Sequence, residues 1–401
     1  MKIYFSTNKT NTKEYATRLI KKVLASYMVD SPEEADVVMV SICDISEIGD
    51  AVRARNFGKP VLAGGMVSEY PVLNELVDYV WHGEVYGLKR QLDSGVDFIN
   101  MESITTPTKR TLLVDQYIDW LANPIVKVGK RAMYYYTSKG CPLKCKYCLI
   151  GNIRDYQVVP EGLYARAVAV AGKNLMPIAA YNPYGVPSSA NIGEVLLRKY
   201  AAGVGHGSGA KMIRTGVEFV NSRNSKTLAK GVTIDHVNEG IARAGAEGTR
   251  LIMYLIAGIE SQEELEDFFS QLSLDYRISP SITFVFTYID PQPFTPFHDF
   301  DLRRKITDID TKRLYRIATE CNKRVRMLPL ARPEKATIRS LLGRATSRQE
   351  YAMITKLSKE PLDAIIETIE RRAPHLLGRS SIDEIASRPR VQITADYWSR
   401  P

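Results

Sequence analysis

The sequence predicts an α/β protein: a parallel sheet near the N-terminus, then a partial barrel of six βα units, then a helical C-terminal extension. Strand-like and helix-like apolar patterns alternate over the first 110 residues and again from residue 131, as is typical of parallel sheets. The last part of the chain shows helical patterns only. We therefore expect three domains, at residues 1–110, 111–330 and 331–401.

In the first block, the clearest strand is the β-branched run at residues 36–42, which suits a strand covered on both faces. Weaker apolar runs predict three further strands, and helical spacing predicts two helices between them. These strands lie at 2–6, 60–63 and 78–81, and the helices at 12–26 and 45–55. Residues 94–124 have weak periodicity, so we expect a connection there.

In the second block, six strand patterns alternate with five helical patterns. The strands are expected at 132–137, 175–181, 211–218, 250–256, 281–287 and 325–328. The helices are expected near 162–173, 191–202, 234–244, 262–272 and 308–323. Six such units would curl into a partial barrel, in which chemistry takes place at the carboxyl ends of the strands.

Composition excludes several classes of protein. The chain has 401 residues, of which 45% are apolar and 25% charged, so it is neither disordered nor fibrous. No run of 18 apolar residues is present, which argues against a membrane helix, and the N-terminus lacks the apolar core of a secretory signal. Only five cysteines are present, and three fall within eight residues. This is not a disulfide framework, and we expect a cytoplasmic protein.

The strongest signal is a group of three cysteines, Cys141, Cys145 and Cys148, directly after the first strand of the second block. Their spacing lets three thiolates hold three irons of a [4Fe–4S] cluster and leaves the fourth iron for another ligand. Zinc is an alternative, but a closed zinc site normally needs a fourth Cys or His, and no histidine lies nearby. The third alternative is three unrelated buried cysteines. The Lys, Gly and Pro residues around them are not a core pattern.

This motif, placed after the first barrel strand, resembles that of the radical S-adenosylmethionine superfamily. Three further stretches resemble members with an elongator-type core: residues 213–218, 255–264 and 288–297. Residues 64–68 and 78–84 resemble the Rossmann-like domain that precedes the barrel in cobalamin-binding members. The resemblance covers roughly residues 1–330. It implies a Rossmann-like N-terminal domain followed by a partial (β/α)6 barrel.

The resemblance also implies a chemistry. Cys141, Cys145 and Cys148 would ligate the cluster, and S-adenosylmethionine would chelate its fourth iron. An electron from a flavodoxin- or ferredoxin-like donor would then yield a 5′-deoxyadenosyl radical that takes a hydrogen from the substrate. Tyr147 matches an aromatic position near the adenine, and Glu218 matches a polar position near the cofactor. Alternatively, Tyr147 only covers the cluster and Glu218 pairs with a nearby Lys or Arg.

The sequence departs from the family pattern at two places. Many members carry Gly-Gly-Glu after the second barrel strand, whereas this chain has Asn182, which offers a carbonyl oxygen without the charge. Asn182 could equally be a turn residue, because Asn-Pro commonly starts turns. In the stretch 44–49, Ser46 stands where some cobalamin-binding proteins have a histidine ligand. Other members bind cobalamin without that histidine, so cobalamin remains possible.

Positive charge is concentrated in one segment. The net charge of the chain is +9, and residues 303–348 hold 14 Lys/Arg against 4 Asp/Glu. This surplus indicates an anionic partner, with nucleic acid as the first candidate, or else a solvated helix face. Tyr315 is the only aromatic residue between 312 and 348, so phosphate contact suits the segment better than base stacking. The candidate phosphate-contacting residues are Lys312, Arg316, Lys323 and Arg339.

Together these features predict a radical S-adenosylmethionine enzyme that modifies or rearranges a nucleic-acid base or its side group in DNA or RNA. The first alternative is a cobalamin-dependent radical methyltransferase that acts on a small molecule. An alternative of another class is a non-catalytic, metal-stabilised nucleic-acid-binding protein. The two enzyme hypotheses require cleavage of S-adenosylmethionine, whereas the third excludes it.

Overall fold

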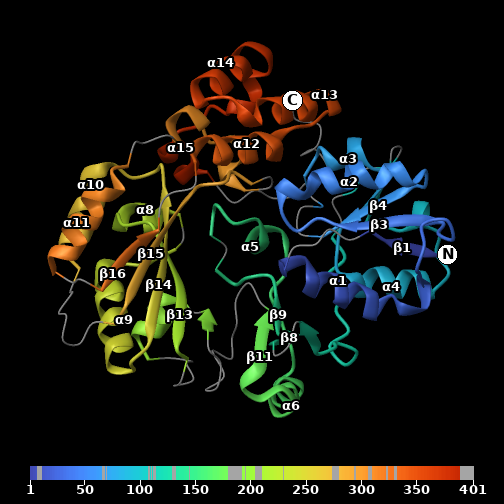
Figure 1. Cartoon of the computed structure of the whole chain (residues 1–401), viewed down its shortest axis with the longest axis horizontal. Coiled ribbons are helices and arrows are strands. Elements are labelled where there is room, and N and C mark those ends of the chain that lie inside the picture. The colour runs from blue at the N-terminus through green and yellow to red at the C-terminus, as the bar shows by residue number, and fades with distance from the viewer. Residues whose placement is uncertain are drawn as a thin grey trace.

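A computed structural model gives the arrangement of most of the chain. It describes residues 1–6, 11–65, 68, 70–106, 109, 111, 114–128, 132–143, 145–178, 192–194, 196–203, 210–228, 230–272, 280–292, 295–305, 309–321, 324–328 and 332–388. Two α/β units lie side by side, and helices from the C-terminal part lie across the top of both (Figure 1). The predicted α/β fold class is confirmed. Over these ranges, no helix combines the length and apolar character needed to cross a membrane.

The first unit is a six-stranded sheet with the order β2-β1-β3-β4-β5-β6. Its strands are β1 (Ile3–Phe5), β2 (Met28–Val29), β3 (Val37–Ser41), β4 (Val61–Gly64), β5 (Tyr79–Trp81) and β6 (Ile104–Thr105). The strands β1 to β5 are parallel, and β6 runs antiparallel at the edge. The four strands expected in this block are confirmed. The strands β2 and β6 were not predicted, because a strand of two residues has no measurable alternation.

Both faces of this sheet are covered, as its apolar strands require. Alternate residues point to opposite faces. Val37 and Met39 join the core under α1 (Asn11–Val23) and α4 (Val85–Asp93). Val38 and Val40 join the core under α2 (Ile48–Ala54) and α3 (Leu73–Leu76). Complete burial of each such side chain contributes about 1.5–3 kcal/mol to folding.

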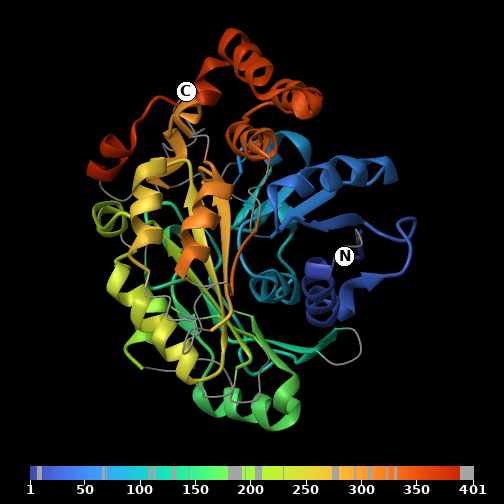
Figure 2. The same cartoon turned by 60° about the vertical axis from the view of Figure 1, so that its left-hand side comes forward.

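The C-terminal helices are α12 (Pro333–Arg344), α13 (Arg348–Lys356), α14 (Leu362–Arg372) and α15 (Ile382–Ser387). The first three share a core with the N-terminal sheet, because Leu341, Ile354 and Ile365 are fully buried in the cluster that also contains Val38. Figure 2 shows these helices reaching from the N-terminal sheet toward the second unit. The helical extension is therefore the outer layer of the first sheet, although it lies at the other end of the chain.

The second unit contains all six predicted strands. They are β8 (Ala132–Tyr136), β11 (Leu175–Ile178), β13 (Met212–Glu218), β14 (Arg250–Ala257), β15 (Ile282–Tyr288) and β16 (Val325–Leu328). Four further strands are present: β7 (Val126–Val128), β9 (Ser138–Lys139), β10 (Gln157–Val158) and β12 (Ile192–Glu194). Across the described ranges of this unit the strands form the sheets β11-β8-β7 and β12-β13-β14-β15-β16 and the short pair β9-β10, and no closed barrel. All neighbours are parallel except β7 with β8 and β9 with β10.

The expected helices of this unit are α6 (Glu161–Ala171), α7 (Leu197–Ala201), α9 (Ile234–Ala246), α10 (Gln262–Ser270) and α11 (Thr311–Cys321). One expectation was wrong in part. The helix predicted at 191–202 starts only at Leu197, and residues 192–194 form β12. They pair with β13 from Met212 onward, and such a backbone ladder outweighs a weak local helical pattern.

The register of the larger sheet brings several strand ends together. Leu251, Met253 and Leu255 face the helical layer and are completely buried. In β13, β14 and β15 the chain runs in the same direction, so the segments after Glu218, Ala257 and Tyr288 leave at one edge. This edge is where a barrel of this type carries its functional residues.

Candidate functional site

The three cysteines lie on a loop that is closed at its base. Strand β8 leads into β9 (Ser138–Lys139), which pairs antiparallel with β10 (Gln157–Val158). We call residues 140–156 the cysteine loop. Gly140 has φ +64°, and a Cβ atom there would lie 2.3 Å from the carbonyl oxygen of Asp155. Only glycine can therefore occupy this position, where the two ends of the loop approach each other.

The three cysteines of the loop are thiols outside any disulfide. Cys145 is buried, whereas Cys141 and Cys148 are half-buried. Burial raises the pKa of Cys145, and the charges of the other two thiols raise it further, which places the three sulfurs near one another. Asn152 donates from Nδ2 to the carbonyl oxygens of Cys145 and Cys148, at 2.9 and 2.7 Å. These bonds hold the loop immediately beside two of its cysteines.

The donor chemistry of the loop fits an iron–sulfur cluster. In the described ranges, His, Cys, Asp and Glu side chains nowhere gather in a group of three around the position of one metal ion. The donor set of the loop is the thiols of Cys141, Cys145 and Cys148. A [4Fe–4S] cluster uses its cysteines in this way, because each thiolate binds a different iron.

Tyr147 connects the cysteine loop to the strand ends. Its ring packs edge-on against Phe219, which follows β13, with ring centres 5.5 Å apart. A second edge-on contact, at 6.5 Å, is to Phe297 in the segment after β15. Burial raises the pKa of Tyr147, and the nearby charges of Glu218 and Cys145 act in the same direction. The structure therefore places Tyr147 beside Cys145 and Glu218. Its predicted adenine contact remains a prediction.

Glu218 ends β13 in a strained conformation. Its φ is +68°, and no other non-glycine residue of the described chain has a positive φ. Such outliers are uncommon and concentrate at functional sites. Its carboxylate pairs with the Lys230 ammonium at 3.2 Å, as the alternative interpretation of Glu218 expected. Lys230 also lowers the pKa of Cys145, so both residues lie by the cysteine loop. The sequence contained no signal for Lys230.

Glu260 supports the segment that follows Glu218. It lies after β14 and is only 2% exposed. Its two carboxylate oxygens accept hydrogen bonds from the backbone N–H groups of Val220 and Asn221, at 2.9 and 2.7 Å. Burial raises the pKa of Glu260 to about 7, because the amide hydrogen bonds only partly offset the loss of solvation. Glu260 was part of a stretch that resembled the family, but its role could not be read from the sequence.

Comparisons with known proteins were made for sequence and for structure. No protein-family model matches the chain, and no curated protein matches it in sequence. A solved structure does match: radical S-adenosylmethionine methyltransferase TsrM from Kitasatospora setae, with cobalamin and a [4Fe–4S] cluster bound. The TM-score is 0.54 at 11% identity, and the match covers 90% of this chain and 99% of that chain.

The chain has the fold of a cobalamin-binding radical S-adenosylmethionine enzyme. Two further matches have lower TM-scores of 0.49. One is TsrM with its tryptophan substrate and an S-adenosylmethionine analogue, at 12% identity, covering 70% of this chain and 72% of that chain. The other is the cobalamin-dependent radical enzyme OxsB with aqua-cobalamin and S-adenosylmethionine, at 13% identity, covering 70% and 53%. The resemblance that the sequence suggested is confirmed as a likeness of fold.

His82 directly follows β5, at the carboxyl edge of the N-terminal sheet. His82 is the only histidine in the first 110 residues. It is 1% exposed, and its Nε2 makes a 2.9 Å hydrogen bond with the hydroxyl of Thr105. Burial and the charge of Arg154 lower the pKa of His82 to about 4. His82 is therefore a buried structural residue of the first unit.

The stretch 44–49 caps a helical turn at this edge. Asp44 accepts from the backbone N–H of Ser46, and Glu47 completes the capping box. Asp44 also binds Arg339 of α12 at 2.7 Å. These contacts give Asp44 and Ser46 a structural role, in the cap of the helical turn and in its link to α12.

Of the predicted phosphate-contacting residues, the three that the structure describes lie on two different helices. Lys312 and Arg316 are exposed on α11, at the outer flank of the barrel (Figure 1). Arg339 lies on α12, where its guanidinium is within 2.7 Å of Asp44 and 3.4 Å of Asp290. Lys323 lies outside the described residues, as does Asn182, the predicted cofactor contact.

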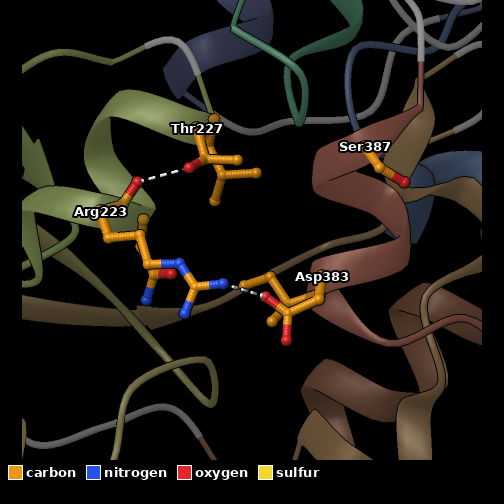
Figure 3. A pocket seen from close by; sticks show the side chains of 7 residues that line it. Arg223, Thr227, Asp383 and Ser387 are labelled. Carbon is orange, nitrogen blue, oxygen red and sulfur yellow. Dashed lines mark hydrogen bonds and ion pairs between the residues drawn. The ribbon is translucent and has the colours of Figure 1, made fainter.

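A small cavity lies beside the cysteine loop, between α8 (Ser222–Thr227) and α15 (Figure 3). Its volume is about 230 Å³. Arg223 and Asp383 form an ion pair of 3.2 Å across it. Its wall includes Leu228, whose carbonyl oxygen accepts from the backbone N–H of Lys146 in the cysteine loop. No cysteine and no acidic residue of the candidate site lines this cavity.

Proposed function

We propose that the protein is a radical S-adenosylmethionine enzyme with a [4Fe–4S] cluster and cobalamin, and that it methylates a small molecule. The observation that carries this proposal is the shared fold, which extends over nine-tenths of the chain and includes both α/β units. Under this proposal the cysteine loop lies between the two cofactor-binding regions. The methyltransferase hypothesis is thus favoured over modification of a nucleic-acid base.

Each residue of the site has a part in this proposal. Cys141, Cys145 and Cys148 would hold the cluster, which when bound supplies the single electron that cleaves S-adenosylmethionine. Tyr147 covers one side of the loop and excludes water. The Glu218 carboxylate, which pairs with Lys230 in this structure, would exchange that partner for a cationic group of S-adenosylmethionine.

The nucleic-acid substrate, the phosphate contacts and the cytoplasmic location predicted from the sequence are not supported by these observations. A nucleic-acid substrate would require cations on a common surface, whereas the charge of Arg339 is used by Asp44 and Asp290. Phosphate contact by Lys312 and Arg316 therefore stays a prediction, as does the cytoplasmic location. The reaction itself requires a one-electron donor, for which a flavodoxin- or ferredoxin-like protein remains our proposal.

Anaerobic reconstitution with iron, sulfide and cobalamin tests the proposed function. We expect one [4Fe–4S] cluster and one cobalamin per chain, and formation of S-adenosylhomocysteine that requires the added cobalamin. Formation of 5′-deoxyadenosine without any cobalamin binding would favour the base-modifying enzyme. Stoichiometric zinc without cleavage of S-adenosylmethionine would exclude both enzymes.

A further inference from the structure

We propose that Glu84 is a positioning residue that holds both ends of the cysteine loop and ties the loop to the N-terminal sheet. Glu84 follows β5 and immediately precedes α4. The effect of Glu84 on a bound cluster rests on the proposed function. The contacts that support the inference join residues of the chain itself.

One carboxylate oxygen of Glu84 meets two cations. Its Oε1 lies 3.3 Å from the ammonium of Lys139 and 2.8 Å from the guanidinium of Arg154. Lys139 comes two residues before Cys141, and Arg154 comes six residues after Cys148. All three cysteines therefore lie between two cations that bind the same oxygen atom.

Burial makes these contacts strong. The side chains of Lys139, Arg154 and Glu84 are 1%, 8% and 16% exposed. Burial lowers the pKa of Lys139, and the negative charge of Glu84 opposes this effect. Without Glu84, two buried cations would lose their shared counter-charge, which is the costly way to break a buried ion pair.

Glu84 is itself held in place from several sides. Its carbonyl oxygen accepts from the indole N–H of Trp81, at 3.1 Å, and its backbone N–H bonds to the carbonyl of Asp115. The Asp115 carboxylate packs against Gly87 so closely that a Cβ there would lie 2.4 Å from the Asp115 Cγ atom. Arg90 pairs with the same carboxylate at 3.1 Å. A rigid residue of the first sheet thus fixes the loop of the second unit.

This arrangement also sets the charge around the loop. With Glu84 present, Lys139 and Arg154 leave one net positive charge, and without it they leave two. A more positive surrounding stabilises the reduced, more negative form of a cluster. Loss of Glu84 should therefore make the reduction potential of a bound cluster less negative.

The first test uses the protein without a cluster. In Glu84→Gln, we expect amide hydrogen exchange in residues 140–154 to become about tenfold faster, because breaking the pairs allows local opening. Glu247→Gln is the matched control: it breaks the 2.7 Å pair with Arg243 on α9, far along the chain from the loop. Should Glu84→Gln fail to fold, Lys139→Met replaces it, with a smaller increase expected. Unchanged exchange in the loop in these variants would overturn the proposal.

The second test uses the reconstituted protein. The cluster of Glu84→Gln should have a less negative potential than that of wild type, and the double variant Glu84→Gln/Lys139→Met, which restores the net charge, should return toward wild type. A merely structural contact predicts that the double variant is at least as perturbed as the single one, and that result would overturn the charge argument. If wild type binds no iron, the proposed function fails, and hydrogen exchange alone decides the role of Glu84.

Discussion

Two segments meet at the candidate site, and each is held by a glutamate that follows a strand. The cysteine loop is held by Glu84, which belongs to the other α/β unit and binds two cations. The segment after β13 is held by Glu260, which belongs to the neighbouring strand β14 and binds two backbone N–H groups. One loop is thus anchored between units by charge, and the other within one sheet by hydrogen bonds.

The difference has a physical consequence. Ion pairs between long side chains tolerate variation in geometry and can join elements from different units. Amide hydrogen bonds are short and directional, so they fix a strained backbone such as that of Glu218. Among the described residues no cation pairs with Glu260, so it retains a desolvation penalty, and burial raises its pKa to about 7. The same residue type therefore holds one segment through ion pairs between units and the other through hydrogen bonds within one sheet.

The largest expected effect separates the roles of the two segments. Replacing Cys141, Cys145 or Cys148 with Ala should abolish cluster binding and cleavage of S-adenosylmethionine, because each thiolate would bind its own iron. Glu218→Gln should retain iron but weaken binding of S-adenosylmethionine. Iron and sulfide analysis and equilibrium binding measure the two outcomes. Cys43→Ala is the control, and loss of iron in this variant would contradict our ligand assignment.

The second effect tests the clamp by Glu260. Glu260→Ala removes the acceptor of two buried N–H groups, so we expect the free energy of unfolding to fall by about 3 kcal/mol. Glu263→Ala is the matched control, since Glu263 is exposed on α10 and should change stability by less than about 0.5 kcal/mol. Urea unfolding measures both variants. Equal stability of the two variants would mean that Glu260 does not support the segment.

The third effect depends on pH. The pKa of Glu260 is about 7 in the folded protein and 4.5 as an ordinary glutamate, so between these values the folded state holds a proton that the unfolded chain has lost. Stability should therefore decrease as the pH rises from 4.5 through 7. Relative to Glu260→Gln, wild type should lose about 3 kcal/mol over this range. Unfolding in urea at several pH values measures this difference, and a constant difference would refute the assignment.

The smallest effect concerns a second anchor of the cysteine loop. Lys146 donates from Nζ to the carbonyl oxygen of Arg388, just after α15, at 3.2 Å. Lys146→Ala should destabilise the protein by about 1 kcal/mol or less, because this is a single, partly buried hydrogen bond. Faster hydrogen exchange in α15 should accompany it. Lys226→Ala, an exposed residue on α8, should leave α15 unchanged, and the same change in both variants would rule out this anchor.

Local patterns predicted much of this protein. The six barrel strands and the four longer strands of the first sheet follow from runs of apolar and β-branched residues. The position of the three cysteines after β8 follows from their order in the chain. Two-residue strands and β12 could not be predicted, because only pairing with a neighbour makes such short segments extended.

The sequence by itself determined where the longer strands lie along the chain and which loop carries the three thiols. Both depend on residues that are close together in the sequence. Only the tertiary structure decided which charges surround that loop. Glu84 and Arg154 are 70 residues apart in the sequence. Glu218 and Lys230 are 12 residues apart, and Asp44 and Arg339 are 295 residues apart. Such pairs have no periodicity or spacing that marks them in a sequence. They form because a charge that is removed from water in the folded chain is stable only beside an opposite charge.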